Sequence, residues 1–300
     1  MFLDKLNILE GFLGSAQKSG SEYLFFCPAH EHHKAKLSVN LEKNVSKCWV
    51  CGETFRSLRF LVRKYGRRDH KEAWLKISGQ IDLSELIESK EQYTVELPKE
   101  FLSIVDLVPG DIFRAKRLLE AKKVWNRRIL YKLGVCKTGL YRERVIIPSF
   151  DAHGNLNYFV GRTYAGNMTR KYVQPPAPGQ IIFNDYAIDW RQPVILVENP
   201  FDSMVVPNSI PLLGSTLSDG TLLFAKICEL SEEVIVSLDL DAEKKEDRVV
   251  KTLQECGLTV TFLEKRKDFS EMTEREIENM IINRKVHTFE EDFMRKLRNI

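Results

Sequence analysis

The sequence contains no apolar run long enough to cross a membrane, although 43% of its 300 residues are hydrophobic. Its longest apolar stretches, such as Val-Ile-Leu-Val at 194–197, are far shorter than the roughly 20 residues that a spanning helix needs. The first ten residues include Asp4 and Glu10, which are not typical of a secretory signal peptide. We therefore expect a soluble protein of the cytoplasm with no membrane partner.

Two other features that would assign the chain to a common class are missing. Six cysteines do not make a usual disulfide framework for a chain of this length. Three of them lie within the first 51 residues, and the scattered remainder are interpreted as core residues: Cys136, Cys228 and Cys256. No GxxxxGK[ST] loop occurs in the sequence, which argues against a motor of the P-loop type.

The net charge of +3 conceals two regions of opposite sign. Residues 112–172 contain 14 Lys and Arg against 3 acidic residues, a local net charge of +11. Residues 229–248 contain 8 acidic residues against 3 basic ones. A basic block followed by an acidic cluster indicates a path for a polyanion that leads to a metal site. Solvated faces on ordinary domains are the alternative interpretation of either region.

A metal-ligand pattern occurs near the amino terminus. The pairs Cys27-x2-His30 and Cys48-x2-Cys51 are separated by 17 residues. Two closely spaced pairs on either side of a hairpin-length segment are typical of a tetrahedral zinc site. We predict one structural Zn²⁺ ion that folds residues 21–66.

The segment around these ligands leaves alternatives open. His32 or His33 is an alternative to His30 as ligand, although equal spacing in both pairs favours His30. Alternating polarity predicts two short strands between the pairs. Interleaved aromatic and basic side chains suit single-stranded nucleic acid, with a small hydrophobic core as the alternative for the phenylalanines. These side chains are Tyr23, Phe25, Phe26, Lys34, Lys36, Lys43, Lys47 and Trp49.

Two stretches with helical periodicity follow the zinc-ligand segment, and the sequence after them has none. Residues 55–66 and 69–79 each place apolar residues at helical spacing, which predicts two helices. The polar stretch after them has no clear period, so we expect a flexible junction near residues 85–100.

The basic region combines a helix and a hairpin. Residues 113–134 are predicted to be helical, and residues 141–164 to form two strands joined by a turn at 151–155. Guanidinium groups on a rigid sheet suit phosphate because they bind it in a bidentate manner. The basic residues that recur on and after these strands are Arg142, Arg144, Arg162 and Lys171. We expect them to bind nucleic acid with strong salt dependence.

From residue 193 onward, apolar strands alternate with amphipathic helices, which predicts a mostly parallel sheet covered on both faces. Ligands bind such sheets at the carboxyl ends of the strands. The acidic residues at these ends are Glu198, Asp202, Asp239, Asp241 and Asp268. Their mutual repulsion predicts bound Mg²⁺, and two such ions can activate a 3′-hydroxyl and stabilise a leaving pyrophosphate. A helix cap is the alternative role for any single acid.

The order of these features resembles the DnaG-type DNA primases. The resemblance rests on the ligand pairs, on "RERVIIP…GRTY…KYVQPP" and on "VILVENPFD…SLDLD…KD". The short chain looks more like the bacteriophage form, of the T-even kind. The resemblance implies an α/β multi-domain fold, with a zinc-ribbon-like β module, a basic α+β subdomain and a Toprim-like parallel α/β sheet. The implied domains are a zinc-binding domain at 1–84, a linker at 85–100, a basic subdomain of the RNA polymerase core at 101–190 and a Toprim catalytic subdomain at 191–300.

The resemblance also implies an activity. It is the template-directed, de novo synthesis of short RNA primers for lagging-strand replication, a nucleotidyl transfer that uses Mg²⁺ or Mn²⁺. Glu198, Asp239 and Asp241 match the catalytic acids, and Asp202 and Asp268 match further metal ligands. The four basic residues named above match contacts to template and nucleotide phosphates. Three positions depart from the family pattern: Asp185, Asn199 and Ser270.

The resemblance further implies partners and a location. The partners are single-stranded template DNA, ribonucleoside triphosphates and a hexameric replicative helicase acting in trans, with a single-stranded DNA-binding protein as a further candidate. The location is the cytoplasm of the host cell if the chain is encoded by a phage.

Two other functions stay open on the residues alone. One is a Toprim nuclease or an enzyme related to topoisomerases, for which the tyrosines of the basic region would be candidate nucleophiles. The other is a non-catalytic, zinc-dependent module that binds single-stranded DNA and whose acidic residues are structural.

Overall fold

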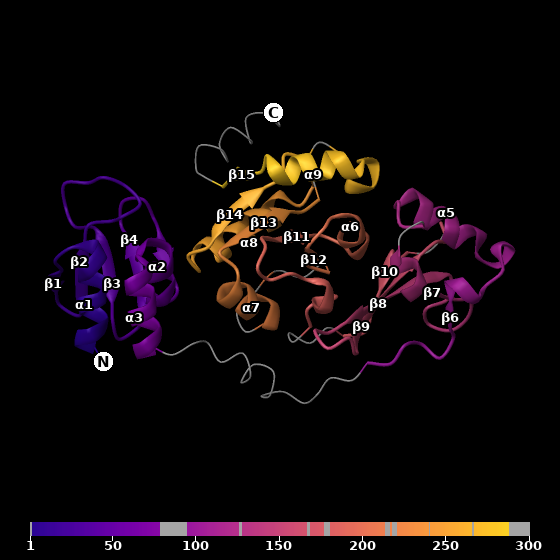
Figure 1. The fold of residues 1–300 in the computed structure, drawn as a ribbon, viewed down its shortest axis with the longest axis horizontal. Helices are drawn as coiled ribbons and strands as arrows, with labels where there is room; N and C mark the ends of the chain where they lie inside the picture. The colour runs from indigo at the N-terminus through magenta and orange to yellow at the C-terminus, as the bar shows by residue number, and fades with distance from the viewer. Residues whose placement is uncertain are drawn as a thin grey trace. The chain divides into compact units, whose positions relative to one another are not determined.

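The computed structural model describes residues 2–78, 95–125, 128–166, 169–176, 181–213, 217, 221–239, 241–265 and 267–287. The chain divides into two compact units, Met1–Asp82 with Asp247–Val260 and Leu83–Glu246 with Thr261–Ile300. The described residues form three five-stranded sheets, which follow one another along the chain (Figure 1). None of the helices in the described ranges is long and apolar enough to span a membrane.

The first sheet belongs to an N-terminal module, residues 2–78. Its antiparallel strands keep the order β1-β2-β3-β4-β5, with helices before and after them. The elements are α1 (Phe2–Leu13), β1 (Gln17–Ser19), β2 (Glu22–Phe25), β3 (Leu37–Asn40), β4 (Val45–Cys48), β5 (Thr54–Phe55), α2 (Leu58–Tyr65) and α3 (Arg68–Ser78). Ser57 caps α2 by accepting a hydrogen bond from the Arg59 N–H. The two predicted strands and the two predicted helices of this region are confirmed.

The second, or middle, sheet is antiparallel in the order β10-β9-β8-β7-β6. Its strands are β6 (Phe101–Ser103), β7 (Gly134–Cys136), β8 (Arg144–Phe150), β9 (Leu156–Thr163) and β10 (Tyr172–Val173). The predicted hairpin is confirmed, since β8 and β9 pair and the Asp151 carboxylate accepts hydrogen bonds from the N–H groups of His153 and Asn155 in the turn.

The predicted helix at 113–134 is wrong in its second half. Helix α5 (Phe113–Ala121) ends early, and residues 128–132 form a 3₁₀ helix instead. Lys123 adopts the left-handed conformation, with φ at 56°, which a continuing α-helix does not permit.

The third, or C-terminal, sheet has the order β12-β11-β13-β14-β15. Strand β11 pairs in parallel with both β12 and β13, whereas β15 is antiparallel to β14. The elements are β11 (Val194–Val197), α6 (Pro200–Val205), β12 (Ser209–Pro211), α7 (Leu222–Leu230), β13 (Glu233–Ser237), α8 (Glu243–Gln254), β14 (Thr259–Phe262), α9 (Glu274–Ile282) and β15 (Lys285–Val286). All four residues of β11 are buried, and in Figure 1 α9 lies above the sheet and α7 below it. The predicted parallel sheet is therefore confirmed, while the short β15 was not predicted.

One hydrophobic cluster joins the middle and C-terminal sheets. It includes Val145 and Ile147 of β8, Tyr158 and Val160 of β9, Ile195 and Val197 of β11, Phe201 of α6 and Ile235 of β13. Because these side chains share a core, the basic strands are held at a defined position beside the parallel sheet.

The predicted junction lies mostly outside the described residues, which resume at residue 95. There, Val95 and Leu97 pack against a second cluster that contains Cys136, Ile146 and Phe159. The predicted domain limits at 84, 100 and 190 stay predictions.

Candidate zinc centre and acidic sheet edge

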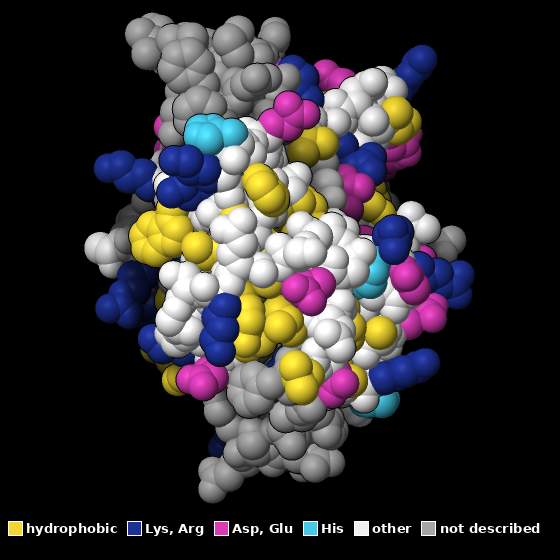
Figure 2. Space-filling view, turned by 90° about the vertical axis from the view of Figure 1, so that its left-hand side faces the viewer, with side chains coloured by type: hydrophobic (Ala, Val, Ile, Leu, Met, Phe, Trp, Pro, Cys, Tyr) yellow, Lys and Arg dark blue, Asp and Glu magenta, His cyan; other side chains and the backbone are white. Residues whose placement is uncertain are grey.

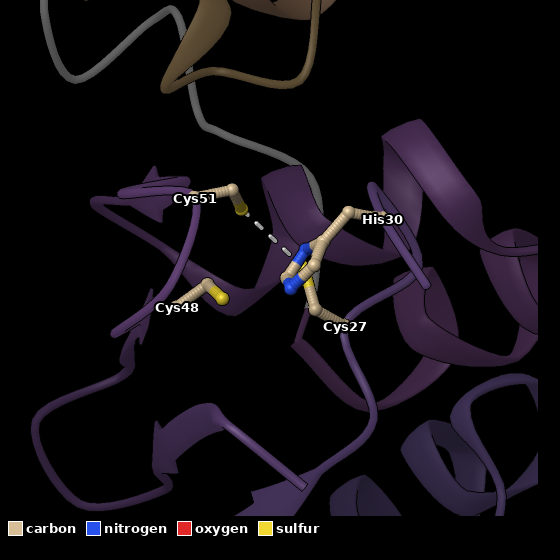
Figure 3. A group of neighbouring side chains, drawn as sticks. All are labelled: Cys27, His30, Cys48 and Cys51. Atoms are coloured by element: carbon tan, nitrogen blue, oxygen red, sulfur yellow. Dashed lines mark hydrogen bonds between the residues drawn. The ribbon is translucent and has the colours of Figure 1, made fainter. Parts of the chain in front are cut away.

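The four predicted zinc ligands lie together in the N-terminal module. The Sγ atoms of Cys27, Cys48 and Cys51 and a ring nitrogen of His30 all lie within 4.8 Å of one another. Figure 3 shows the four side chains pointing toward a common centre. Cys48 ends β4, and the turn after it closes with Gly52 at a φ of 76°, a conformation that glycine adopts without strain.

The chemistry of this group fits Zn²⁺. Both ring nitrogens of His30 are buried and have no hydrogen-bond partner among the described residues, so a metal would supply the missing contact. Burial raises the pKa of the Cys27 thiol to about 12 and raises that of Cys51 as well. Burial also acts on Cys48, but the N–H groups of Cys51 and Val50 bring its pKa below the ordinary value. Thiols that stay protonated by themselves release protons when a cation binds them.

The structure places the two alternative ligands elsewhere. His32 accepts a hydrogen bond from the Lys34 N–H at 3.1 Å, and its ring stacks on His33 with centroids 4.4 Å apart. His30 is therefore the histidine that joins the three cysteines, as the spacing predicted.

Aromatic side chains of the module divide between core and surface. Phe25 is fully buried, whereas Phe26 is 50% exposed and Trp49 is 67% exposed. The Lys47 ammonium lies 4.5 Å from the centre of the Trp49 ring. On the face shown in Figure 2, exposed hydrophobic side chains lie among Lys and Arg side chains, with several Asp and Glu side chains between them. An exposed ring beside an ammonium group provides a surface on which a base can stack.

The five acidic residues lie at the carboxyl ends of the parallel strands, and we call this group the acidic edge. Glu198 directly follows β11 and Asp202 lies in α6. Asp239 and Asp241 follow β13, and Asp268 precedes a 3₁₀ turn after β14. The edge thus draws on four separate segments, as the alternation of strands and helices predicted.

The carboxylates of the acidic edge act on one another. Burial raises the pKa of Asp202 to about 7, and the charges of Asp239 and Asp268 add to this increase. The pKa of Asp239 is also raised, by burial and then by Glu198, Asp268 and Asp241. Among the described residues, however, only the four zinc ligands have ligand atoms close enough together to hold one metal ion. The carboxylates of the acidic edge do not form such a group in this structure.

Two lysines and an asparagine offset this repulsion within the chain. The Lys245 ammonium lies 2.8 Å from Glu198 Oε1, and the Lys265 ammonium lies 3.7 Å from Asp239 Oδ1. Asn199 caps α6 and donates from Nδ2 to Asp202 Oδ2 at 2.6 Å. The sequence alone assigned no role at the edge to either lysine, because the strand ends were searched for acidic residues.

The donor set of the acidic edge fits a divalent cation. Carboxylate oxygens are the ligands that Mg²⁺ and Mn²⁺ prefer. The second oxygen of Glu198, Oε2, is buried and has no hydrogen-bond partner among the described residues. A cation would supply that contact and would reduce the repulsion that, in addition to burial, raises the pKa values of Asp202 and Asp239.

The predicted phosphate-binding residues differ in their exposure. Arg142 and Lys171 are exposed, and the Arg162 guanidinium lies 4.7 Å from the centre of the Tyr172 ring. Burial raises the pKa of Tyr172 to about 12, and the charges of Asp202 and Asp239 add to this increase.

Arg144, in contrast, is buried with 4% exposure. It donates from Nη1 to the Arg142 carbonyl at 3.1 Å and from Nη2 to the Arg170 carbonyl at 3.0 Å. In this structure it holds neighbouring backbone segments together, and its predicted contact with phosphate stays a prediction.

Asp185, one of the departures from the family pattern, has a structural role. It is 8% exposed and accepts hydrogen bonds from the Lys226 ammonium at 2.6 Å and from the Trp190 indole at 2.9 Å. This buried network ties the segment after the middle sheet to α7 of the C-terminal sheet.

Comparison with known proteins agrees with these features. Residues 7–93 match the family model of the CHC2 zinc finger, of the DnaG zinc-ribbon type. The chain is similar to the DNA primase of Helicobacter pylori strain J99, with 23% identity over 291 residues that cover 80% of this chain and 51% of the relative. It is also similar to the DNA primase of Mycoplasma pneumoniae, with 21% identity over 327 residues that cover 83% and 51%. The chain spans about half the length of these curated relatives.

Among solved structures, the chain is similar to that of the zinc-binding and RNA polymerase domains of the Aquifex aeolicus primase. It shares 20% identity and a TM-score of 0.48, and the match covers 98% of this chain and 88% of that chain. The resemblance to DnaG-type primases and the α/β class with its N-terminal zinc-binding module are confirmed, whereas the bacteriophage form stays a prediction.

Proposed function

We propose that this chain is a DNA primase, a DNA-directed RNA polymerase that begins short RNA primers de novo on single-stranded DNA during lagging-strand replication. The observation that carries the proposal is a CHC2 zinc centre in the same chain as an acidic edge flanked by a basic sheet. Each feature alone is compatible with other activities, but a polymerase that starts chains needs template recognition, phosphate binding and divalent cations together.

The zinc module would recognise a short stretch of template. One structural Zn²⁺, held by Cys27, His30, Cys48 and Cys51, would fix the loops on either side of the ligand pairs. Trp49 and its neighbouring Lys47 would then offer a stacking surface and a positive charge to an unpaired template base.

The acidic edge would carry the chemistry. Glu198, Asp239 and Asp241 would hold Mg²⁺ or Mn²⁺, with Asp202 and Asp268 as further ligands. When bound, such ions favour ionisation of the attacking 3′-hydroxyl and neutralise charge on the leaving pyrophosphate.

The residues of the middle sheet would position the polyanions. Arg162, whose guanidinium lies 4.7 Å from the centre of the Tyr172 ring, would bind nucleotide phosphates. The exposed Arg142 and Lys171 would bind the template backbone, and Arg144 would support the backbone between them.

The partners follow from this role. They are single-stranded template DNA, ribonucleoside triphosphates, a hexameric replicative helicase acting in trans and a single-stranded DNA-binding protein. We place the protein in the cytoplasm, that of the host if a phage encodes it.

The test is primer synthesis by the zinc-loaded chain on single-stranded DNA with labelled ribonucleotides and Mg²⁺. We expect short, template-dependent RNA products, and a loss of about 10³-fold in the double variant Asp239→Asn/Asp241→Asn. The matched control is Asp106→Asn, which changes an exposed aspartate in the 3₁₀ turn after β6 and should leave synthesis unchanged.

Each contrary result points to a different function. Cleavage of the DNA without incorporation of ribonucleotides would support a nuclease. Full synthesis by the double variant would remove the acidic edge from the reaction.

A further inference from the structure

Lys265 has an unusual position at the acidic edge. It follows β14, its side chain is only 3% exposed, and its ammonium nitrogen has no hydrogen-bond partner among the described residues. The ammonium lies 3.7 Å from Asp239 Oδ1 and 4.7 Å from the centre of the Phe269 ring. A buried cation is thus directed at the carboxylates without being hydrogen-bonded to any of them.

Such burial is costly for a lysine. An ammonium group is strongly hydrated, and its transfer from water must be compensated by nearby negative charge. Lys267, two residues later, shows the ordinary arrangement, with 41% side-chain exposure and a 2.8 Å contact with Glu276. The acidic edge, together with the Phe269 ring, is what compensates Lys265, and Lys265 in turn offsets the charge of the edge.

The lysines at the acidic edge affect how strongly it can bind a metal ion. Lys245 and Lys265 contact Glu198 and Asp239 respectively, and the charge of Lys122 also acts on Asp202. A divalent cation entering this group has to share Asp239 with the Lys265 ammonium or displace it. Repulsion between two cations a few ångströms apart, in a partly buried site, weakens the binding of the second.

We propose that Lys265 is a built-in counter-ion that competes with the divalent cation for Asp239 and lowers the affinity of the acidic edge for Mg²⁺ and Mn²⁺. In the metal-free protein it keeps Asp239 paired, so the edge is stable without a resident ion. The inference rests on the proposed function, because it takes the acidic edge to be the divalent-cation site.

The test measures Mn²⁺ binding to the full, zinc-loaded chain without nucleotide, by the electron paramagnetic resonance signal of free Mn²⁺. Lys265→Met removes the charge and nearly preserves the volume. We expect this variant to bind Mn²⁺ about tenfold more tightly than the natural protein. Lys267→Met is the matched control, and we expect it to bind like the natural protein. Lys265→Arg keeps the charge and should also bind like the natural protein.

A second measurement tests the proposal in case Lys265→Met is less stable or does not fold without metal. The unfolding temperature is recorded with and without Mn²⁺, since a ligand that binds the folded state more tightly raises it further. We expect a larger Mn²⁺-dependent increase for Lys265→Met than for the natural protein. If the variant does not fold even with Mn²⁺, the competition for Asp239 is refuted, because the lysine is then needed in the presence of the ion.

The outcomes separate this inference from the proposed function. Suppose that the natural protein binds Mn²⁺, that Asp239→Asn/Asp241→Asn abolishes this binding, and that Lys265→Met binds Mn²⁺ equally well or more weakly. This result overturns the role of Lys265 and leaves the metal site in place. Absence of Mn²⁺ binding at the edge in the natural protein and in Lys265→Met overturns both. Binding only after removal of the lysine charge supports the inference strongly.

Discussion

Replacement of Asp202 by asparagine is expected to stabilise the fold at neutral pH. Burial and the neighbouring Asp239 raise the pKa of Asp202 from 3.8 to about 7 in the folded protein, whereas the unfolded chain keeps the ordinary value. The folded state therefore holds this proton more tightly than the unfolded state does. The protonated Asp202 carboxyl contributes its full stabilisation below about pH 4, and this contribution is lost as the pH rises toward 7. Above pH 7 the folded protein bears the full cost of a buried, ionised carboxylate.

The magnitude follows from the shift. Each pKa unit corresponds to about 1.4 kcal/mol, which makes the cost about 4 kcal/mol at pH 8 relative to pH 4. This pKa already includes the opposing charges of Lys265 and Lys122, and water that enters around an ionised carboxylate reduces the measurable gain to about 2 kcal/mol. An asparagine can keep the contact with the Asn199 side chain through its own oxygen, so we expect no loss of that hydrogen bond.

The assay is urea unfolding of the zinc-loaded protein without Mg²⁺, followed by circular dichroism between pH 5 and 8. Asp202→Asn should show a free energy of unfolding that exceeds that of the natural protein by a margin growing with pH. Added Mg²⁺ should stabilise the natural protein more than the variant, because the carboxylate is then neutralised by the cation. A variant less stable than the natural protein at pH 8, or a difference independent of pH, would refute this reasoning.

The remaining predictions concern the zinc module and the basic sheet. Cys48→Ser should abolish stoichiometric zinc binding and unfold the N-terminal module, as seen by metal analysis and circular dichroism, whereas His32→Ala should keep one equivalent of zinc. Trp49→Ala should weaken the binding of short single-stranded DNA by about 1–3 kcal/mol in fluorescence anisotropy, without a change in the unfolding temperature. Arg144→Lys should lower the unfolding temperature, because lysine lacks the two separate guanidinium nitrogens that reach the two carbonyl groups. Lys171→Ala should leave the unfolding temperature unchanged and should instead reduce the salt dependence of DNA binding.

The lysines change how the clustered carboxylates are understood. Repulsion between Asp239 and Asp241 at one strand end suggested that only bound cations could compensate it. The structure adds Lys245 and Lys265 as compensation from within the chain. A site balanced in this way can fold before it binds metal, and the metal then has to compete with the lysines for the carboxylates.

Some features of this protein were determined locally by its sequence. The zinc ligands could be predicted because a two-residue gap within each pair constrains both side chains to one side of a tight turn, and the structure brings all four together. The acidic edge could be predicted as well, because strands of a parallel sheet place their carboxyl ends on the same side, wherever Glu198 and Asp239 lie in the sequence.

Other features depended on the tertiary structure. Arg142 and Arg144 are the same residue type and lie two positions apart in the sequence. Arg142 is nevertheless exposed, whereas Arg144 is buried against backbone carbonyls. Phe25 and the adjacent Phe26 divide between core and surface in the same way. Lys265 comes to face Asp239 only because β14 is assembled into the same sheet as β13. Burial and the pairing of charges are set by contacts between distant segments, and a pattern of neighbouring residues does not contain them.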